Sequence, residues 1–356
     1  IMDKAVGSKI ADYLIKPVNP NQVLLSIKKN VHSQQLVTEQ TTADYRAEFG
    51  RLSSALQMAD SFADWCNVYR RITNWEIELS DSTDQSIKEV IEYQKHEANQ
   101  EFCKFVRRNY YDWINKRDET TPVMSHTLMR SRILPVADEN SKTTLLLIDN
   151  FRYDQWKVLA HDIGDLFDIE EDMYMSILPT ATQYARNAIF SGLMPDKIAQ
   201  MFPDLWVDEE EEEGKNLNEA PLIQTQFDRY RRHNTFSYHK INDSMGADKF
   251  LDKYNELKNY DLNVVVINFI DMLSHARTES KMVRELANNE SAYRSITQSW
   301  LHHSVLSELF KLLSQSNYKV IITTDHGSIR ATKPLKIVGD RNTNTNLRYK
   351  LGKNLA

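Results

Sequence analysis

The chain has 356 residues, of which 41% are hydrophobic and 26% are charged, and this composition excludes collagen-like, low-complexity and wholly disordered proteins. Fifty acidic and 44 basic residues leave a net charge of −6, and the acidic run Asp208–Glu213 accounts for the excess, so this mixed charge gives no sign of duplex-DNA binding. The longest apolar runs, Leu145–Ile148 and Val264–Ile267, are far shorter than a membrane span of about 20 residues.

The cysteine content and the first residues of the sequence indicate the cellular compartment. Cys66 and Cys103 are too few for a disulfide framework and form no CxxC zinc motif. The first residues lack the charged start and apolar core of a secretory signal peptide. Both observations favour a cytoplasmic protein.

Residues 1–35 are expected to contain a short strand and a helix. The strand at 13–15 ends at Lys16-Pro17, and Asn19-Pro20 provides a cap and a first-turn proline for the helix. Apolar residues then recur at helical spacing, namely Val23, Leu24, Ile27 and Val31. Because one strand and one helix cannot bury a core alone, we expect this segment to be the end of a larger domain that starts before this sequence.

Residues 36–132 carry helix formers, almost no glycine and no β-type alternation. Apolar residues recur with helical spacing in two stripes, which predicts a helical bundle or connector with these side chains in its core. The first stripe contains Phe62, Trp65, Tyr69, Ile72 and Ile77, and the second contains Ile87, Val90, Ile91, Phe102, Phe105, Val106, Trp113 and Ile114.

Residues 133–356 change to an α/β pattern. Three apolar runs, at about 143–148, 262–270 and 318–324, each end in an aspartate, and helical stretches lie between them. Uninterrupted apolar runs of this kind are typical of strands buried on both faces of a parallel sheet. The more polar segment of about 196–260 is expected to be an insertion or cap.

The residues that end these runs are candidate metal ligands, because functional groups collect at the carboxyl ends of strands in doubly wound sheets. Asp149 follows the first run, Asp271 and His275 follow the second, and Asp325 with His326 follows the third. Carboxylates and imidazoles suit zinc, and paired metal ions can stabilise the attacking and leaving oxygens of a phosphoryl group. Asp149 alone is more readily explained as a turn or helix cap, but the three strand ends together predict a two-zinc site.

A candidate nucleophile lies in the segment ILPTATQYAR at 177–186. Thr180 or Thr182 would lie at a helix N-terminus, where unpaired backbone N–H groups favour negative charge, and a metal could activate the hydroxyl. The threonine could equally be the ordinary cap of a helix from 182 to 190.

The order of these motifs resembles that of the alkaline phosphatase superfamily, and most closely its PglZ branch. The matching motifs are Asp149, Pro179-Thr-x-Thr182, Asp271-x-x-x-His275 and Asp325-His326-Gly327. The resemblance implies an α/β three-layer sandwich and a phosphohydrolase with two zinc ions. It implies that one zinc is bound by Asp149, Thr182, Asp325 and His326, and the second by Asp271 and His275.

The resemblance also selects the nucleophile. In the superfamily this residue lies ten positions before the glycine that closes its helix, so Gly192 indicates Thr182 rather than Thr180. Arg186 matches a position that often faces the anion. The superfamily supplies a final histidine to the second metal, and no histidine follows His326. Either this ligand lies beyond residue 356, which we favour, or the second site is defective.

Residues 7–29, GSKIADYLIKPVNPNQVLLSIKK, resemble the end of a response-regulator receiver domain, with a switch lysine at Lys16. A receiver, a helical connector and a PglZ domain in this order resemble the PorX-type response regulators of the type IX secretion system. The resemblance implies phosphorylation by a sensor histidine kinase, a homodimer of the phosphorylated form, and a secretion-motor protein or sigma factor as a possible partner.

The expected activity is attack by Thr182 on a nucleotide-type phosphodiester, because a threonine nucleophile resembles the nucleotide pyrophosphatase branch. Tyr230 and Arg232 of the insertion are candidates to stack on or clamp a nucleotide or oligonucleotide substrate. The alternative is a phosphorylation-controlled scaffold with a vestigial metal site, which would use the connector and the acidic run Asp208–Glu213 to bind its partner. A DNA-binding regulator is disfavoured, because the sequence has no helix-turn-helix signal and is net negative.

Overall fold

The computed structural model describes Lys16 and residues 20–356, apart from positions 81, 83, 117, 138–141, 209, 210, 212, 213, 317, 332, 342, 345 and 347. The chain divides into two compact units, the helical unit Ile1–Thr121 and the α/β unit Pro122–Ala356. The strand expected at 13–15 lies outside the described residues. Within the described ranges, every helix is too short or too polar to cross a bilayer.

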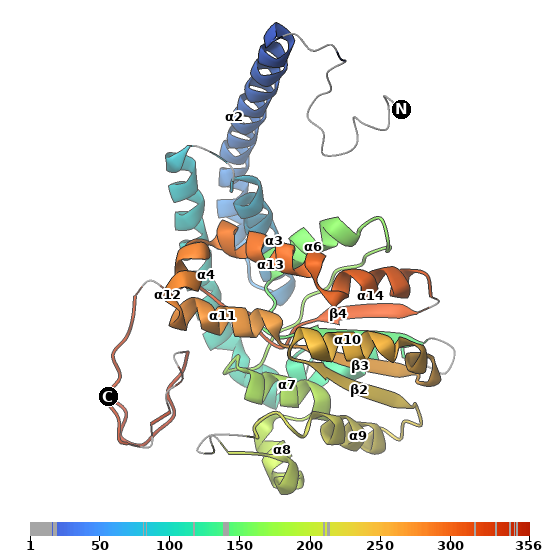
Figure 1. The fold of residues 1–356 in the computed structure, drawn as a ribbon. Helices are drawn as coiled ribbons and strands as arrows, with labels where there is room; N and C mark the ends of the chain where they lie inside the picture. Colours follow the sequence, from blue (N-terminus) through green and yellow to red (C-terminus); the bar gives the residue numbers. More distant parts are fainter. Residues whose placement is uncertain are drawn as a thin grey trace. The chain divides into compact units, whose positions relative to one another are not determined.

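The helical unit contains α2 (Pro20–Met58), α3 (Phe62–Glu78) and α4 (Gln85–Asn115), which Figure 1 shows in blue to cyan. The helix predicted after Asn19 begins at Pro20 and continues past residue 35, where the sequence analysis placed a domain boundary. The start of α3 is fixed by a capping box, in which the Asp64 backbone N–H donates to Ser61 Oγ and the Ser61 backbone N–H donates to the Asp64 side chain.

The core of the helical unit is aromatic. Trp65 and Phe105 from the predicted stripes are buried, with ring centroids 5.9 Å apart, whereas Tyr69 and Val90 from the same stripes are exposed. Tyr45 of α2 is fully buried and its hydroxyl donates to the Gln94 side chain of α4 at 2.9 Å. Burial raises the pKa of Tyr45 to about 12.

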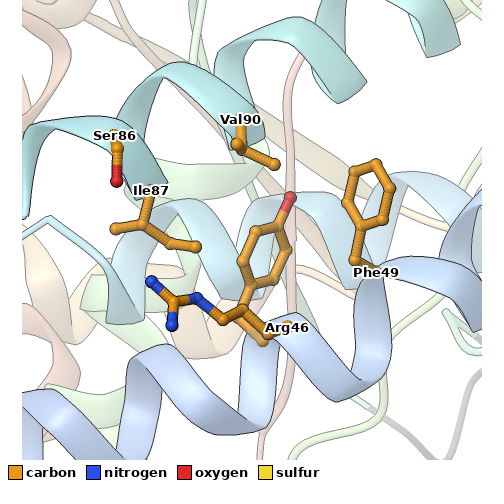
Figure 2. A pocket seen from close by; sticks show the side chains of 6 residues that line it. Arg46, Phe49, Ser86, Ile87 and Val90 are labelled. Atoms are coloured by element: carbon orange, nitrogen blue, oxygen red, sulfur yellow. The ribbon is translucent and has the colours of Figure 1, made fainter.

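A shallow hollow of about 230 Å³ lies between α2 and α4 (Figure 2). Tyr45, Arg46 and Phe49 line it from α2, and Ser86, Ile87 and Val90 line it from α4. The lining contains neither a carboxylate nor an imidazole, so it offers none of the metal-ligand chemistry that the sequence predicts elsewhere.

The α/β unit is built on a parallel sheet in the order β2-β3-β1-β4. The strands are β1 (Thr143–Ile148), β2 (Phe236–Ile241), β3 (Leu262–Ile267) and β4 (Lys319–Thr323). Every residue of β1 and β3 is buried, which is why their sequences are apolar throughout.

Helices cover both faces of this sheet (Figure 1), which confirms the predicted α/β three-layer architecture. Leu146 and Ile148 of β1 pack on one face against α6 (Tyr153–Ile163), α10 (Ser244–Asp252), α13 (Glu290–His303) and α14 (Val305–Ser314). Leu145 and Leu147 pack on the other face against α7 (Thr182–Ser191) and α9 (Glu219–Arg229).

Shorter elements complete the α/β unit. They are α5 (Ser125–Leu128), the π-helix η1 (Met129–Ile133), α8 (Pro195–Met201), the 3-10 helices η2 (Pro203–Leu205) and η3 (Tyr254–Asn259), α11 (Phe269–Glu279) and α12 (Lys281–Leu286). Gly192 ends α7 with a left-handed backbone (φ 66°), and a side chain here would also collide with Gln226.

The sequence analysis missed β2. It lies inside the segment 196–260, which was expected to be an insertion or cap, yet it pairs with β3 in the central sheet. The strand has the sequence FSYHKI, and only Ser237 and Ile241 are buried. Because β2 is an edge strand with mixed polarity, its sequence lacks the continuous apolar run by which the other strands were found.

A buried ion network, here called the brace, joins α6, α11 and α13. Asp154 accepts from Arg152 at 2.9 and 2.6 Å and from Arg294 at 3.1 Å. Glu290 accepts from Arg277 at 2.9 Å and also pairs with Arg152. Burial raises the pKa of Asp154 and of Glu290, but the adjacent arginines outweigh burial and hold both pKa values below their ordinary range.

Candidate metal centre

Three of the predicted ligands meet at the carboxyl end of the sheet. Asp149 directly follows β1, and Asp325 and His326 follow the adjacent strand β4, so the parallel pairing brings them to the same edge. Their exposed fractions are 3%, 0% and 7%, and their ligand atoms lie within 4.8 Å of one another. Such a buried group of carboxylates and imidazole is a candidate metal site.

Thr182 is the first residue of α7 and lies beside this group. Its Oγ1 is 3.0 Å from His326 Nε2 and 3.4 Å from Asp149 Oδ1. The N-cap of α7 is Ala181, so the Thr182 hydroxyl faces the ligand group and is not the helix cap. Thr180 lies differently, because its Oγ1 accepts from Arg348 at 2.9 Å. Of the two threonines, Thr182 is therefore the one whose hydroxyl lies beside the ligand group.

The donor atoms fit zinc. A tetrahedral zinc with bonds of about 2.0–2.1 Å has ligand atoms roughly 3.3–3.5 Å apart. Thr182 Oγ1, Asp149 Oδ1 and His326 Nε2 form a triangle with sides of 3.0, 3.4 and 3.5 Å. In the tautomer with its proton on Nδ1, His326 donates to the Gly327 carbonyl, 3.1 Å away, and leaves the Nε2 lone pair for the metal.

The second predicted pair lies on α11. Asp271 Oδ2 is 3.4 Å from His275 Nε2, one helical turn away, and the His275 side chain is 69% exposed. Burial raises the pKa of Asp271, but the hydrogen bond and charge of His275, the charge of His326 and the hydrogen bond from Asn150 together outweigh burial and lower the pKa below its ordinary value. Within the described part of the chain, this pair lies outside the close group of three ligands.

Asn150 connects the two sets of ligands. It has a left-handed backbone (φ 59°) and is 3% exposed. Its backbone N–H donates to Asp325 Oδ1 at 3.4 Å, and its side-chain amide donates to Asp271 Oδ1 at 3.1 Å. Asparagine tolerates this backbone conformation better than most residues, which places both donors toward the site.

Arg186 follows Thr182 by one turn of α7 and is 1% exposed. Its guanidinium pairs with Asp149 Oδ2, donates to Asp325 Oδ2 at 2.9 Å and reaches Glu219 Oε1 at 3.3 Å. The sequence analysis expected this side chain to face the anion. The structure instead places it among three carboxylates.

The two buried aspartates affect each other's ionisation. Burial and the neighbouring Asp325 charge raise the pKa of Asp149 well above its ordinary value, even though Arg186 opposes this shift. For Asp325, burial also raises the pKa, but the charges of Arg186 and His326 bring it below the ordinary value. Asp325 therefore ionises more readily than Asp149.

Sequence reasoning missed the residues that hold Arg186. Glu219, at the start of α9, is 1% exposed and accepts from the Tyr238 hydroxyl and from Lys240 Nζ at 3.1 Å. Asn268, just after β3, accepts from Arg186 at 3.3 Å. An acid in the first turn of a helix is common, so Glu219 gives no signal in sequence. The lysine inside β2 would have been a signal had the strand been recognised.

Tyr230 and Arg232 do not lie near the ligands. They follow α9 and precede β2, at the amino end of the sheet, whereas Asp149 and Asp325 are at the carboxyl end. Tyr230 packs against the hydrophobic cluster on the α9 face. The expectation that this pair clamps the substrate is therefore wrong, because α9 carries them away from the site.

Comparison with known families accounts for most of the chain. The family described as the BREX system PglZ alkaline phosphatase-like domain matches residues 128–356, which is more than half of the sequence. The family described as the PorX response regulator linker domain matches residues 35–114. No curated protein gives a significant match. The chain therefore belongs to the PglZ alkaline phosphatase-like family and carries a PorX-type response regulator linker domain ahead of its PglZ domain.

Proposed function

We propose that this protein is a response regulator whose PglZ domain is a zinc-dependent phosphodiesterase. The observation that carries the proposal is the triangle formed by Thr182 Oγ1, Asp149 Oδ1 and His326 Nε2. It combines a hydroxyl nucleophile with two zinc-type ligands at the N-terminus of α7. Membership of the PglZ alkaline phosphatase-like family supports a phosphohydrolase.

In the proposed reaction, Thr182 Oγ1 forms a bond to phosphorus while the ester bond to the leaving alcohol breaks. Water then breaks the bond between phosphorus and threonine and releases the phosphomonoester. Asp149, Asp325 and His326 would hold one zinc ion with Thr182, and Asp271 and His275 would contribute to a second. Bound zinc supplies positive charge for the non-bridging oxygens and lowers the pKa of the hydroxyl.

A nucleotide-type phosphodiester is the substrate class that we propose. Tyr184 lies two residues after Thr182, and its ring centroid is 6.0 Å from that of Trp206 and 5.9 Å from that of Tyr349. Aromatic side chains are common partners of nucleobases. This group replaces Tyr230 and Arg232 as the candidate contact for a base.

The test combines metal analysis with hydrolysis. Purified protein is expected to contain at least one zinc ion per chain and to hydrolyse bis(p-nitrophenyl) phosphate, and a chelator should remove both properties. Full activity without transition metal would contradict the zinc proposal. Bound zinc without hydrolysis of this diester or of short oligonucleotides would favour the alternative, a phosphorylation-controlled scaffold for a secretion-motor protein or a sigma factor.

Control of the enzyme by phosphorylation is a further part of the proposal, and the PorX-type linker supports it. A sensor histidine kinase would phosphorylate the receiver, Lys16 would contact the phosphoryl group, and the phosphorylated protein would form a homodimer. Sedimentation of the full-length protein should show a monomer-to-dimer shift with beryllofluoride, which Lys16→Ala should reduce. An unchanged mass, with beryllofluoride binding confirmed, would reject dimerisation.

A further inference from the structure

We propose that Arg186 is a positioning residue that, anchored by Glu219, orients Asp149 and Asp325 for metal binding. This inference rests on the proposed metal site. It assigns Arg186 a role different from contact with the substrate anion, and it gives Glu219 a role toward the metal although it is not a ligand.

The guanidinium of Arg186 is buried among carboxylates and is not open to a substrate. Its Nε donates to Asp325 and its Nη1 to Glu219, its Nη2 forms an ion pair with Asp149, and the residue is 1% exposed. Nη1 is shared between Glu219 and Asn268, each at 3.3 Å. A phosphate could reach this group only after Arg186 left its buried carboxylate partners, which would leave buried charges unpaired.

The two carboxylate oxygens of each aspartate have different partners. Arg186 forms ion pairs with Oδ2 of Asp149 and with Oδ2 of Asp325. Oδ1 of Asp149 is left beside Thr182 and His326, where the zinc-type triangle lies. Oδ1 of Asp325 accepts from the backbone of Asn150 at 3.4 Å and of His326 at 3.0 Å. Both carboxylates are thus fixed in rotation before any metal binds.

Arg186 is itself held in place by Glu219 and Asn268. Glu219 Oε1 accepts from Arg186, while Oε2 accepts from the Tyr238 hydroxyl and from Lys240. Lys240 Nζ also donates to the Asn216 carbonyl at 2.9 Å, and the Asn216 amide donates to the Thr182 carbonyl at 3.3 Å. One lysine on β2 therefore connects the anchor of Arg186 to the backbone of the proposed nucleophile.

The acidic and basic side chains around Arg186 do not balance in number. Asp149, Asp325 and Glu219 bring three carboxylates, against which stand the two cations Arg186 and Lys240. Arg186 thus allows two aspartates to lie together in the interior but leaves the cluster with an acid in excess. This excess negative charge favours the binding of a divalent cation.

The experiment measures zinc affinity by competition with a chromogenic chelator and KM for bis(p-nitrophenyl) phosphate at saturating zinc. Glu219→Gln preserves shape and an acceptor for Arg186, and should weaken zinc binding about tenfold with KM unchanged. Arg186→Lys loses the forked geometry and should weaken zinc binding about 100-fold. Excess zinc should restore turnover in Glu219→Gln.

Arg294→Lys is the matched control, because Arg294 is also buried and also bonds an aspartate, but in the brace. It should lower the melting temperature and leave zinc affinity unchanged. The inference is overturned if Glu219→Gln and Arg186→Lys bind zinc as tightly as the wild type, or if they raise KM at unchanged zinc affinity. Wild-type protein that binds no zinc would instead overturn the proposed function.

Discussion

Two buried clusters of acids and arginines lie within the α/β unit, and they differ in charge balance. The brace has three cations for two carboxylates, namely Arg152, Arg277 and Arg294 with Asp154 and Glu290. The cluster around Arg186, here called the ligand cluster, has two cations for three carboxylates, namely Arg186 and Lys240 with Asp149, Asp325 and Glu219.

The ionisation of their acids follows this difference. In the brace, the pKa of Asp154 is lowered in spite of burial, because Arg152 and Arg294 pair with the carboxylate. In the ligand cluster, burial and Asp325 raise the pKa of Asp149 although Arg186 touches it. In the brace both acids are paired with arginines, which completes the network as a structural element, whereas an excess of acid beside an imidazole and a hydroxyl is a place for a further cation.

The largest effect should come from removing an acid of the ligand cluster. Asp325→Asn is expected to abolish zinc binding at this group and to lower diester turnover by about 10³-fold, because charge stabilisation at phosphorus is lost. Elemental analysis and initial rates on the same preparation measure both effects. Retention of zinc and of activity would show that the excess acid has no metal role.

Removing an acid of the brace should affect stability and not metal. Asp154→Asn removes the buried negative charge that Arg152 and Arg294 share and should cost about 3 kcal/mol of unfolding free energy at neutral pH. In the wild type, the Asp154 carboxylate stabilises the folded state at pH values above its unfolded-state pKa of about 4. This stabilisation is lost as the pH falls through its lower pKa in the folded state.

The variant should therefore lose less stability than the wild type as the pH falls below about 4. Urea denaturation across this pH range, with zinc content as the control, tests the claim. A loss of zinc in Asp154→Asn would mean that the two clusters are not independent.

The third effect concerns the hydroxyl beside the ligand cluster. Thr182→Val keeps the shape of the side chain and should lower turnover by about 10²-fold, because Oγ1 forms the bond to phosphorus. Thr180→Val is the control and should retain turnover, because the Thr180 hydroxyl bonds Arg348 instead. Rapid-quench detection of a phosphoprotein would identify the nucleophile directly, and the reverse pattern of activity would reassign it to Thr180.

The smallest effect should come from the open pair on α11. Because His275 is mostly exposed, its ligand site is less preorganised than the ligand cluster. His275→Ala is expected to remove only the weaker zinc equivalent and to lower turnover by about tenfold. A zinc titration that still shows two equivalents would exclude His275 as a ligand.

The topology of the sheet decided which residues of the candidate site could be predicted from the sequence. Asp149, Asp325 and His326 could be predicted, because parallel strands place their carboxyl ends together and buried strands have apolar sequences. The partners of Arg186 could not be predicted from the sequence, because the spacing between Arg186 and Thr182 is the same whether Arg186 faces solvent or carboxylates. Only packing of α7 against α9 decides that Glu219 meets it.

The edge strand β2 and the misplaced pair Tyr230 and Arg232 have a common cause. A half-exposed strand of mixed polarity looks like a loop, so the sequence analysis assigned the whole segment 196–260 to a cap. Once β2 is recognised, the residues just before it must lie at the amino end of the sheet. A single missed strand therefore reversed the expected position of two residues.

The strand order has a consequence for synthesis on the ribosome. β1 lies between β3 and β4, and Asn150 is 175 residues from Asp325, its hydrogen-bond partner. At about 5–20 residues per second, β1 emerges roughly 9–35 s before the strand that completes its pairing. Such distant contacts also form slowly, because loop closure must come first. During this interval we expect the apolar stretch Leu145–Ile148 to depend on chaperones for protection from aggregation.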